Sequence, residues 1–188
     1  MKHAYTKKHK NGKEKIFKLI KFRTMTNAKD KNGRLLPDDQ RLGKYGALLR
    51  STSLDELPSL LNIMAGHISI VGPRPQLVRD MTFMTDEQRR RHDVRPGLTG
   101  LAQVNGRNNI TWERKLEYDL QYIDSGITLF GDIRIILQTV GKVLKRSDTV
   151  REGTVSDMDF GDWLIMEGKV DQETYDAKQA EAKDLLEV

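Results

Sequence analysis

Two neighbouring carboxylates, Asp55 and Glu56, lie where a helix is expected to begin, inside the run from Arg50 to Pro58. One interpretation is structural, because Ser53 followed three residues later by Glu56 fits a capping box. Alternatively, Asp55 is the N-cap and Pro58 lies in the first turn, where a missing N–H costs little. The other interpretation is catalytic, since an ionised carboxylate favoured by helix N-terminal donors can attack phosphorus or carbon while its neighbour holds a divalent ion. Taken alone, the pattern favours capping.

Two further segments present arginine on rigid or glycine-rich backbone. In residues 71–75 (VGPRP) the two prolines restrict the chain, so Arg74 is expected in an extended loop that offers its guanidinium to a phosphate. Residues 95–108 are glycine-rich and contain Arg107; glycine permits close backbone approach, and exposed N–H groups can cradle phosphate. This run matches neither a P-loop nor a dinucleotide fingerprint, so an ordinary loop stays an alternative.

The remaining polar candidates are individually weaker. Lys21 belongs to residues 21–25 (KFRTM), which also fit an amphipathic edge strand. Asp119 and Asp132 lie on expected helices and are by default surface acids, although the apolar neighbours of Asp132 favour a partner. His67 and His92 are expected to be structural or exposed. Together, the arginines, the glycine-rich loops and the acid pair indicate a site for a phosphorylated ligand and a divalent metal.

Hydrophobic patterning predicts the elements that must position these side chains. The turn Asn11-Gly12 predicts a β-hairpin whose second arm runs from about Lys15 to Met25, and residues 68–71 predict a short strand. Residues 27–38 are typical of a polar loop. Apolar spacing of i, i+3 and i+4 predicts helices near 39–50, 55–65, 76–91, 111–123 and 128–146. The expected fold class is α/β (α+β), with a small sheet or hairpin surrounded by helices, some of them amphipathic.

Composition excludes several classes of protein. The chain of 188 residues has no cysteine, which rules out a disulfide scaffold and a cysteine-based zinc site. No run approaches the roughly 20 apolar residues of a membrane span, and no signal-peptide pattern opens the chain. Residues 1–50 carry 15 Lys and Arg against four acids, whereas residues 156–188 carry ten acids against three lysines. The basic end predicts an anionic partner, but no nucleic-acid recognition motif is present.

At these motifs the chain resembles the bacterial sugar transferase family, the monotopic phosphoglycosyl transferases that start surface-glycan assembly. The matching segments are residues 21–25 (KFRTM), 50–58 (RSTSLDELP), 71–75 (VGPRP) and 95–108 (RPGLTGLAQVNGRN). They are collinear over roughly residues 10–150. The resemblance changes the interpretation of the acid pair from a cap to a catalytic dyad.

The family moves a sugar-1-phosphate from a UDP-sugar to a polyprenyl phosphate, such as undecaprenyl phosphate, and releases UMP. The resemblance implies that Asp55 attacks the sugar-linked phosphate and forms a covalent phosphosugar intermediate. It also implies that Glu56 binds Mg²⁺, which neutralises the diphosphate. The resemblance further implies a set of substrate-binding residues, namely Arg74, which would grip phosphate, with Lys21, Arg50 and Arg107 as candidate contacts and Asp132 in the family's late acidic position.

Members of the family usually begin with an apolar re-entrant helix, whereas this sequence opens just ahead of the hairpin, so we expect no N-terminal membrane helix in this chain. The resemblance then implies a peripheral protein on the cytoplasmic face of the inner membrane, with amphipathic helices along its surface. A catalytic domain is expected over residues 1–154 and an acidic helical extension over residues 155–188.

Other interpretations of the function stay open beside the transferase. One is a catalytically impaired fragment or a regulatory partner that binds a nucleotide sugar. A nucleic-acid-binding module has less support, because aromatic residues make up only 6% of the chain and would have to stack on bases. A second copy of the chain, or another protein of glycan assembly, is also an open partner.

Overall fold

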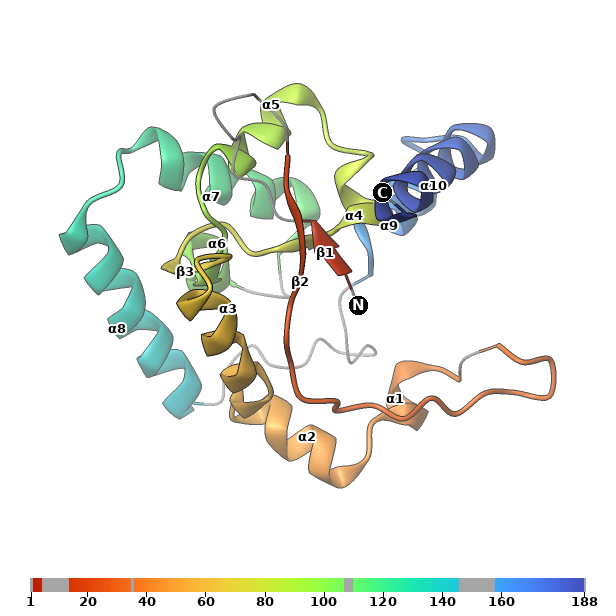
Figure 1. Ribbon diagram of the computed structural model, residues 1–188, viewed down its shortest axis with the longest axis horizontal. Helices are drawn as coiled ribbons and strands as arrows, with labels where there is room; N and C mark the ends of the chain where they lie inside the picture. Colours follow the sequence, from red (N-terminus) through yellow and green to blue (C-terminus); the bar gives the residue numbers. More distant parts are fainter. Residues whose placement is uncertain (1, 5–13, 35, 107–109, 146–157, 188) are drawn as a thin grey trace.

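The computed structural model describes residues 2–4, 14–34, 36–106, 110–145 and 158–187 (Figure 1). This part of the chain is mixed α/β and mostly helical, which confirms the expected fold class. The strands are β1 (Lys2–Ala4), β2 (Ile16–Lys18), β3 (Ser69–Val71), β4 (Gln76–Leu77) and β5 (Gly97–Thr99). The helices are α1 (Asp38–Arg41), α2 (Lys44–Ser51), α3 (Leu60–Met64), α4 (Val78–Met81), α5 (Asp86–Arg89), α6 (Leu101–Val104), α7 (Trp112–Asp124), α8 (Leu129–Lys145), α9 (Phe160–Met166) and α10 (Gln172–Glu187), with 3-10 helices η1 (Leu54–Ser59) and η2 (Arg90–Asp93).

The larger sheet is antiparallel in the order β2-β1-β4, with His3 opposite Phe17 on one side and Leu77 on the other. The pairing of β1 with β2 agrees with the predicted hairpin, although Asn11-Gly12 lies outside the described residues. The second arm is shorter than expected. Strand β2 ends at Lys18, and Met25 forms only an isolated bridge with Leu42.

The smaller sheet pairs β3 with β5 in parallel and joins two of the arginine-bearing segments. Its edge requires glycine, because a Cβ on Gly72 would lie 2.4 Å from the carbonyl oxygen of Arg95, and one on Gly97 would lie 2.1 Å from the nitrogen of Gly72. The N–H of Gly97 donates to the carbonyl of Pro73 at 2.9 Å. Because these glycines have no Cβ, the backbone of the 71–75 loop packs directly against that of the 95–99 segment.

The helices predicted over 111–123 and 128–146 are confirmed by α7 and α8, while the helix predicted over 76–91 is wrong. That segment begins as strand β4, because Leu77 pairs with His3 of β1. It then breaks into α4, α5 and η2. Thr85 starts α5 anew with a capping box that involves Gln88. The predictions over 39–50 and 55–65 are each divided in two, into α1 with α2 and η1 with α3.

The acidic end of the chain folds onto the rest of the molecule. Helix α10 confirms the predicted acidic helix, and its Ala182 packs in one apolar cluster with Val78 and Met81 of α4. Helix α9, which was not predicted, places Phe160 in a cluster with Trp112 and other apolar residues. The predicted domain boundary falls within residues 146–157, which lie outside the described part, so the division stays a prediction.

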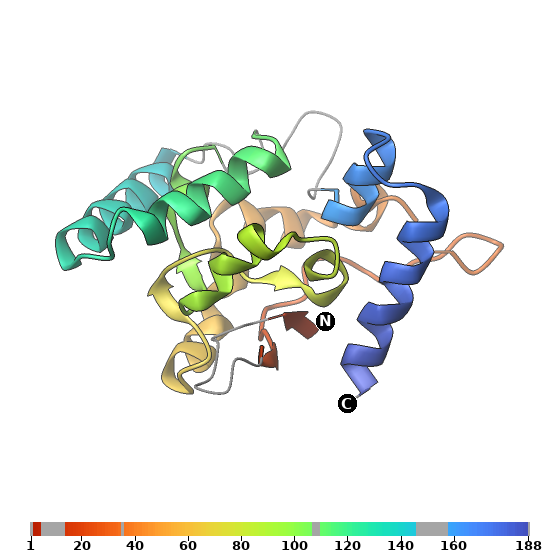
Figure 2. The ribbon, with the colours of Figure 1, turned by 90° about the horizontal axis from the view of Figure 1, so that it is seen from above.

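Helix α8 turns most of its apolar stripe outward. Only Ile135 is buried on this helix, whereas Phe130 is 84% exposed and Leu137 is 66% exposed. Figures 1 and 2 both show α8 on the opposite side of the molecule from α10. None of the described helices combines the length and the apolar character needed to cross a bilayer.

Candidate active site

Buried polar side chains fix the extended segment that carries Lys21. Asn62 donates from Nδ2 to the carbonyl of Lys18 and accepts at Oδ1 from the N–H of Ile20, both at 2.9 Å. Ser59 donates to the carbonyl of Ile20 at 2.9 Å. Asn62 and Ser59 are both buried, so these bonds satisfy side-chain polar atoms that water does not reach. The segment is thereby held against η1 and α3, with Lys21 facing the acid pair.

The acid pair lies in the first turn of η1, which begins at Leu54 directly after a strained residue. Ser53 lies at the N-cap, but its φ of 56° is left-handed and its side chain makes no capping hydrogen bond. The predicted capping box is therefore wrong, and so is the alternative with Asp55 as N-cap, because Asp55 and Glu56 lie inside the first turn. With neither carboxylate used as a cap, the structural interpretation of the pair loses its support.

Glu56 joins two cations from different parts of the chain. Its Oε1 accepts from Lys21 Nζ and from Arg74 Nη2, each at 3.0 Å. Burial alone would raise the pKa of Glu56, but the charges of Arg74 and Lys21 outweigh it and hold the pKa at about 2. Glu56 is therefore ionised at every physiological pH and holds Lys21 and Arg74 together.

Asp55 has a different environment although it is the next residue. Burial raises its pKa, the neighbouring charge of Glu56 adds to the rise, and Lys21, Arg50 and Arg74 partly oppose it. Those five residues thus form one electrostatic cluster, as their sequence motifs predicted. In the same cluster, Arg50 donates from Nε to Thr24 Oγ1 at 3.0 Å.

Two of the predicted substrate-binding residues are not part of this cluster as described. Arg107 lies outside the described residues, so its place stays a prediction. Asp132 lies in the first turn of α8, where its Oδ1 accepts from the hydroxyl of Tyr122 at 2.8 Å. Burial and the charge of Asp132 both raise the pKa of that phenol. This confirms that Asp132 has a partner, but the partner belongs to α7 and not to the acid pair.

Comparison with known proteins identifies the family of this chain. Residues 2–146 match the family described as bacterial sugar transferase. The chain belongs to the bacterial sugar transferase family. It is 53% identical over 130 residues to a protein of Bacillus subtilis (strain 168) named as the uncharacterized sugar transferase EpsL, a match that covers 69% of this chain and 64% of that protein.

Other sugar transferases show the same partial coverage. A UDP-glucose:undecaprenyl-phosphate glucose-1-phosphate transferase of Klebsiella pneumoniae is 43% identical over 138 residues, covering 68% of this chain and 30% of that protein. The exopolysaccharide production protein ExoY of Rhizobium meliloti (strain 1021) is 37% identical over 144 residues, covering 68% and 63%. This sugar transferase chain therefore spans less than two thirds of these relatives' length.

Sequence reasoning missed a buried ion pair behind the site of this sugar transferase. Asp119, expected as a surface acid, is only 2% exposed and accepts at Oδ2 from Arg91 Nη2 at 2.6 Å. His92, expected to be structural or exposed, is buried and lies 3.0 Å from Glu14. The basic run 89–92 gave no signal of this burial, because charged residues are mostly exposed unless they find a partner.

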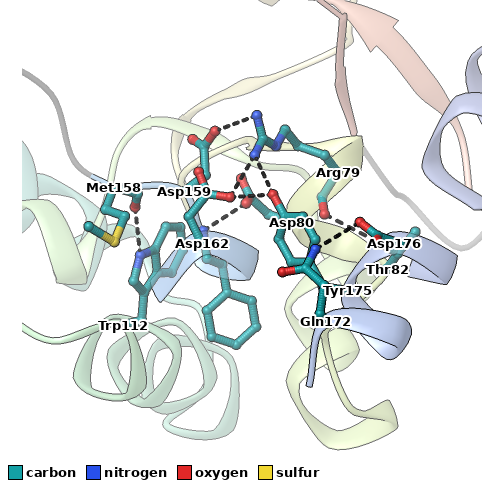
Figure 3. A network of polar contacts seen from close by, with 11 residues as sticks. Arg79, Asp80, Thr82, Trp112, Met158, Asp159, Asp162, Gln172, Tyr175 and Asp176 are labelled. Carbon is teal, nitrogen blue, oxygen red and sulfur yellow. Dashed lines mark hydrogen bonds and ion pairs between the residues drawn. The ribbon is translucent and has the colours of Figure 1, made fainter. Parts of the chain in front are cut away.

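A second missed cluster ties the C-terminal helices to α4 (Figure 3). Arg79 forms ion pairs with Asp159 at 3.0 Å and Asp162 at 2.9 Å. Asp80 is buried and accepts at Oδ1 from the N–H of Phe160 at 2.8 Å. Burial, reinforced by Asp159, raises the pKa of Asp80 to about 7. Asp159 and Asp162 belong to the tail that composition alone marked only as acidic.

The donor set at the acid pair fits the Mg²⁺ that the family resemblance implies. Adjacent carboxylates supply hard oxygen ligands, and Mg²⁺ is typically held by one or two carboxylates together with substrate phosphates. Among the described residues no group of three or more acids or histidines gathers into an all-protein metal site. Glu56, with Asp55 beside it, would therefore hold the ion jointly with a phosphate-bearing substrate.

Proposed function

We propose that this chain transfers a sugar-1-phosphate from a UDP-sugar to a polyprenyl phosphate, the first step of exopolysaccharide, capsule or O-antigen assembly. The observation that carries the proposal is the cluster of Lys21, Arg50 and Arg74 around the Asp55–Glu56 pair. Three cations against two carboxylates leave a surplus of positive charge for an anionic diphosphate. The relative from Klebsiella pneumoniae carries this activity in its name, which gives the substrate class.

In the proposed first step, an ionised Asp55 oxygen attacks the phosphorus attached to the sugar. A bond forms between that oxygen and phosphorus, the bond from phosphorus to the bridging oxygen of the diphosphate breaks, and UMP leaves with the electron pair. In the second step an oxygen of the polyprenyl phosphate attacks the same phosphorus. The aspartyl–phosphorus bond breaks, the lipid diphosphate sugar forms, and Asp55 is regenerated.

The surrounding residues have separate roles in this proposal. Arg74 and Lys21 exchange part of their contact with Glu56 for the diphosphate oxygens and hold the reacting phosphorus next to Asp55. Arg50 adds positive charge near the developing negative charge. When bound at Glu56, Mg²⁺ supplies charge neutralisation for the diphosphate. Because the pKa of Asp55 is raised, the carboxylate is protonated at a higher pH than an ordinary aspartate. Activity should therefore begin to fall at a higher pH than the usual pKa of aspartate would predict.

A lipid acceptor requires that the site meet a membrane, and we place the exposed apolar side chains at that contact. They lie on the helices around the acid pair and along α8, at Tyr45, Leu48, Leu57, Leu61, Met64, Phe130, Ile133, Leu137, Val140 and Leu144. Met64 and Phe130 are each 84% exposed. Apolar side chains exposed along amphipathic helices are typical of proteins that lie in a membrane interface. The proposed location is the cytoplasmic face of the inner membrane.

The activity is tested by release of UMP. The protein is mixed with UDP-glucose or UDP-galactose, Mg²⁺ and undecaprenyl phosphate in detergent micelles, and UMP is quantified over time. We expect Mg²⁺-dependent release that Asp55→Asn abolishes, because an amide is a poor nucleophile toward phosphorus. Release at an equal rate from the Asp55→Asn protein would remove Asp55 from the role of nucleophile.

The covalent intermediate has its own test. Incubation with the UDP-sugar and Mg²⁺ without acceptor should leave a sugar-phosphate adduct on the peptide that contains Asp55, detected by mass spectrometry. The adduct should disappear when undecaprenyl phosphate is added. An adduct on another residue, or UMP release that occurs only when acceptor is present and leaves no adduct, contradicts the two-step route.

Membrane contact is tested by sedimentation with phosphatidylglycerol vesicles. Phe130→Ser combined with Leu137→Ser should lower vesicle binding about tenfold, because both exposed side chains lose their apolar area. The matched control is Leu185→Ser on α10, an exposed leucine on the side of the molecule opposite α8. Equal loss in the control would place the membrane contact elsewhere.

A further inference from the structure

The basic run 89–92 distributes its side chains among separate elements. Arg89 and His92 both bind Glu14, just ahead of β2. Arg90 pairs with Asp124 at the end of α7. Arg91 is the most deeply buried of the four, at 1% exposure. Its Nη2 donates both to Asp119 Oδ2 and to a backbone carbonyl oxygen, that of Arg74, at 2.7 Å.

The Arg91–Asp119 pair is poorly explained by stability alone. Both side chains are almost completely buried, at 1% and 3% exposure, so each has lost its hydration. Among the described residues, Arg91 Nε and Nη1 and Asp119 Oδ1 find no hydrogen-bond partner. A buried pair of this kind can often be replaced by apolar residues without loss of stability. The hydrogen bond that connects the pair to the rest of the molecule is the bond to the Arg74 carbonyl.

That carbonyl belongs to the residue whose guanidinium binds Glu56. Arg74 stands between Pro73 and Pro75, which have no N–H to anchor the loop. The carbonyl of Pro73 is held by the N–H of Gly97 at 2.9 Å, and the carbonyl of Arg74 is held by Arg91. Arg74 is therefore fixed at its backbone from the interior and at its side chain from the site.

We propose that Arg91 and Asp119 are positioning residues, which set the location of Arg74 for its contact with the diphosphate of the substrate. This inference rests on the proposed function, because it assigns the Arg74 guanidinium to phosphate. Asp119 orients the Arg91 guanidinium, and Arg91 fixes the backbone of Arg74. Helix α7 thus contributes to the site without any side chain that touches substrate.

The test is a double-mutant cycle read out by the affinity for UDP, measured calorimetrically in the presence of Mg²⁺. Arg91→Met and Asp119→Leu are introduced together, so that no unpaired charge stays buried. We expect this change to weaken UDP binding about tenfold in the wild-type background. In an Arg74→Ala background the same change should have no further effect, because the residue it positions is gone. Arg90→Met, one residue away, is the matched control and should leave UDP affinity unchanged.

Two results would overturn the proposal: an equal loss of affinity in both backgrounds, which indicates a general structural effect, or no loss in the wild-type background. If the double variant does not fold, Arg91→Lys replaces it, since lysine keeps the charge opposite Asp119 but not the guanidinium that reaches the Arg74 carbonyl. Weaker UDP binding by this variant supports the proposal, and unchanged binding rejects it.

The cycle also separates this inference from the proposed function. If wild-type protein binds no UDP, the proposed function fails, and the ligand-free protein decides the inference. The Nε–H resonance of Arg74, assigned by its loss in Arg74→Ala, should then move when the Arg91–Asp119 pair is replaced. An unmoved resonance would show that the pair does not position Arg74.

Discussion

One short segment of the chain, residues 74–79, contributes an arginine to each of two charged clusters. Arg74 binds Glu56 of η1, and Arg79 binds Asp159 and Asp162 beside and within α9. Each arginine therefore connects a distant part of the sequence to the same piece of backbone. The residue types are alike, yet we assign one cluster to catalysis and the other to architecture.

The two clusters differ in the sign of their surplus charge and in the groups that satisfy their buried acids. Lys21, Arg50 and Arg74 outnumber the two carboxylates of the acid pair. Around Arg79 the acids are in excess, and the buried one, Asp80, is satisfied by the backbone N–H of Phe160. A cluster with excess cations can bind an anionic ligand. A cluster with excess acids repels one, and its buried acid already has its hydrogen-bond donor in the backbone.

The largest expected effect comes from the same carboxylate-to-amide change made in each cluster. Glu56→Gln should lower kcat/KM for UMP release by roughly 10³-fold, about 4 kcal/mol, because Lys21, Arg74 and the proposed Mg²⁺ all lose the charge of their shared partner. Asp162→Asn removes one partner of Arg79 and should leave kcat/KM within twofold. Comparable kinetic losses in both variants would show that the two clusters are one functional unit.

The next effect is on stability and should occur only on the C-terminal side. Phe160 is 3% exposed and packs against Trp112 and Trp163, with ring centroids 5.2 and 6.0 Å away. Phe160→Ala should cost about 3 kcal/mol and lower Tm by roughly 6–12 °C in calorimetry. Phe130→Ala, on an exposed site of α8, is the matched control and should leave Tm nearly unchanged. An equal fall of Tm in Phe130→Ala would show that the destabilisation does not come from the packing of α9.

Some elements of the fold could be predicted from the sequence and others could not. Helices α7 and α8 were predictable because their apolar spacing repeats over several turns. The segment 76–91 was not, because its first residues pair with β1 and a local cap at Thr85 restarts the helix. Such pairing joins residues more than 70 positions apart, and periodicity within one window carries no information about it.

The site shows the same limit at the level of side chains. Residue types and the family resemblance identified Lys21, Arg50, Asp55, Glu56 and Arg74, and the structure brings all five together. The partners of those residues were not predictable. That Asp119 is buried depends on Arg91, which lies 28 positions away and whose orientation comes from the packing of η2 against α7.

A change in pH should affect the stability contributed by the two clusters in opposite directions. The raised pKa of Asp80, about 7, means that the folded state holds this proton more tightly than the unfolded state. Its contribution is therefore fully present below about pH 4 and is lost as the pH rises through 7, by at most about 1.4 kcal/mol per pH unit. Glu56, with a pKa of about 2, contributes stability above pH 4.5 that is lost only as the pH falls toward 2.

The measurement is urea unfolding of wild type and Asp80→Asn between pH 5 and pH 7. The amide keeps an oxygen that can accept from Phe160 N–H but does not titrate. Relative to Asp80→Asn, wild type should lose about 2 kcal/mol of stability across this range. Parallel stability curves for the two proteins would show that Asp80 does not titrate in the folded state. Glu56→Gln should run parallel to wild type over the same range, since Glu56 is ionised throughout it.

The smallest change that still separates the clusters is removal of one hydroxyl from each. Thr24→Val deletes the acceptor of the Arg50 Nε–H, and Tyr175→Phe deletes a hydroxyl that contacts both Arg79 and Asp162. Each loss should cost about 1 kcal/mol, or roughly 2–4 °C in Tm. Only Thr24→Val should also raise KM for the UDP-sugar, by about threefold, because Arg50 loses its orientation next to the diphosphate. Equal destabilisation with unequal KM would mean that the clusters differ in access to substrate rather than in strength, which is what their opposite charge surplus requires.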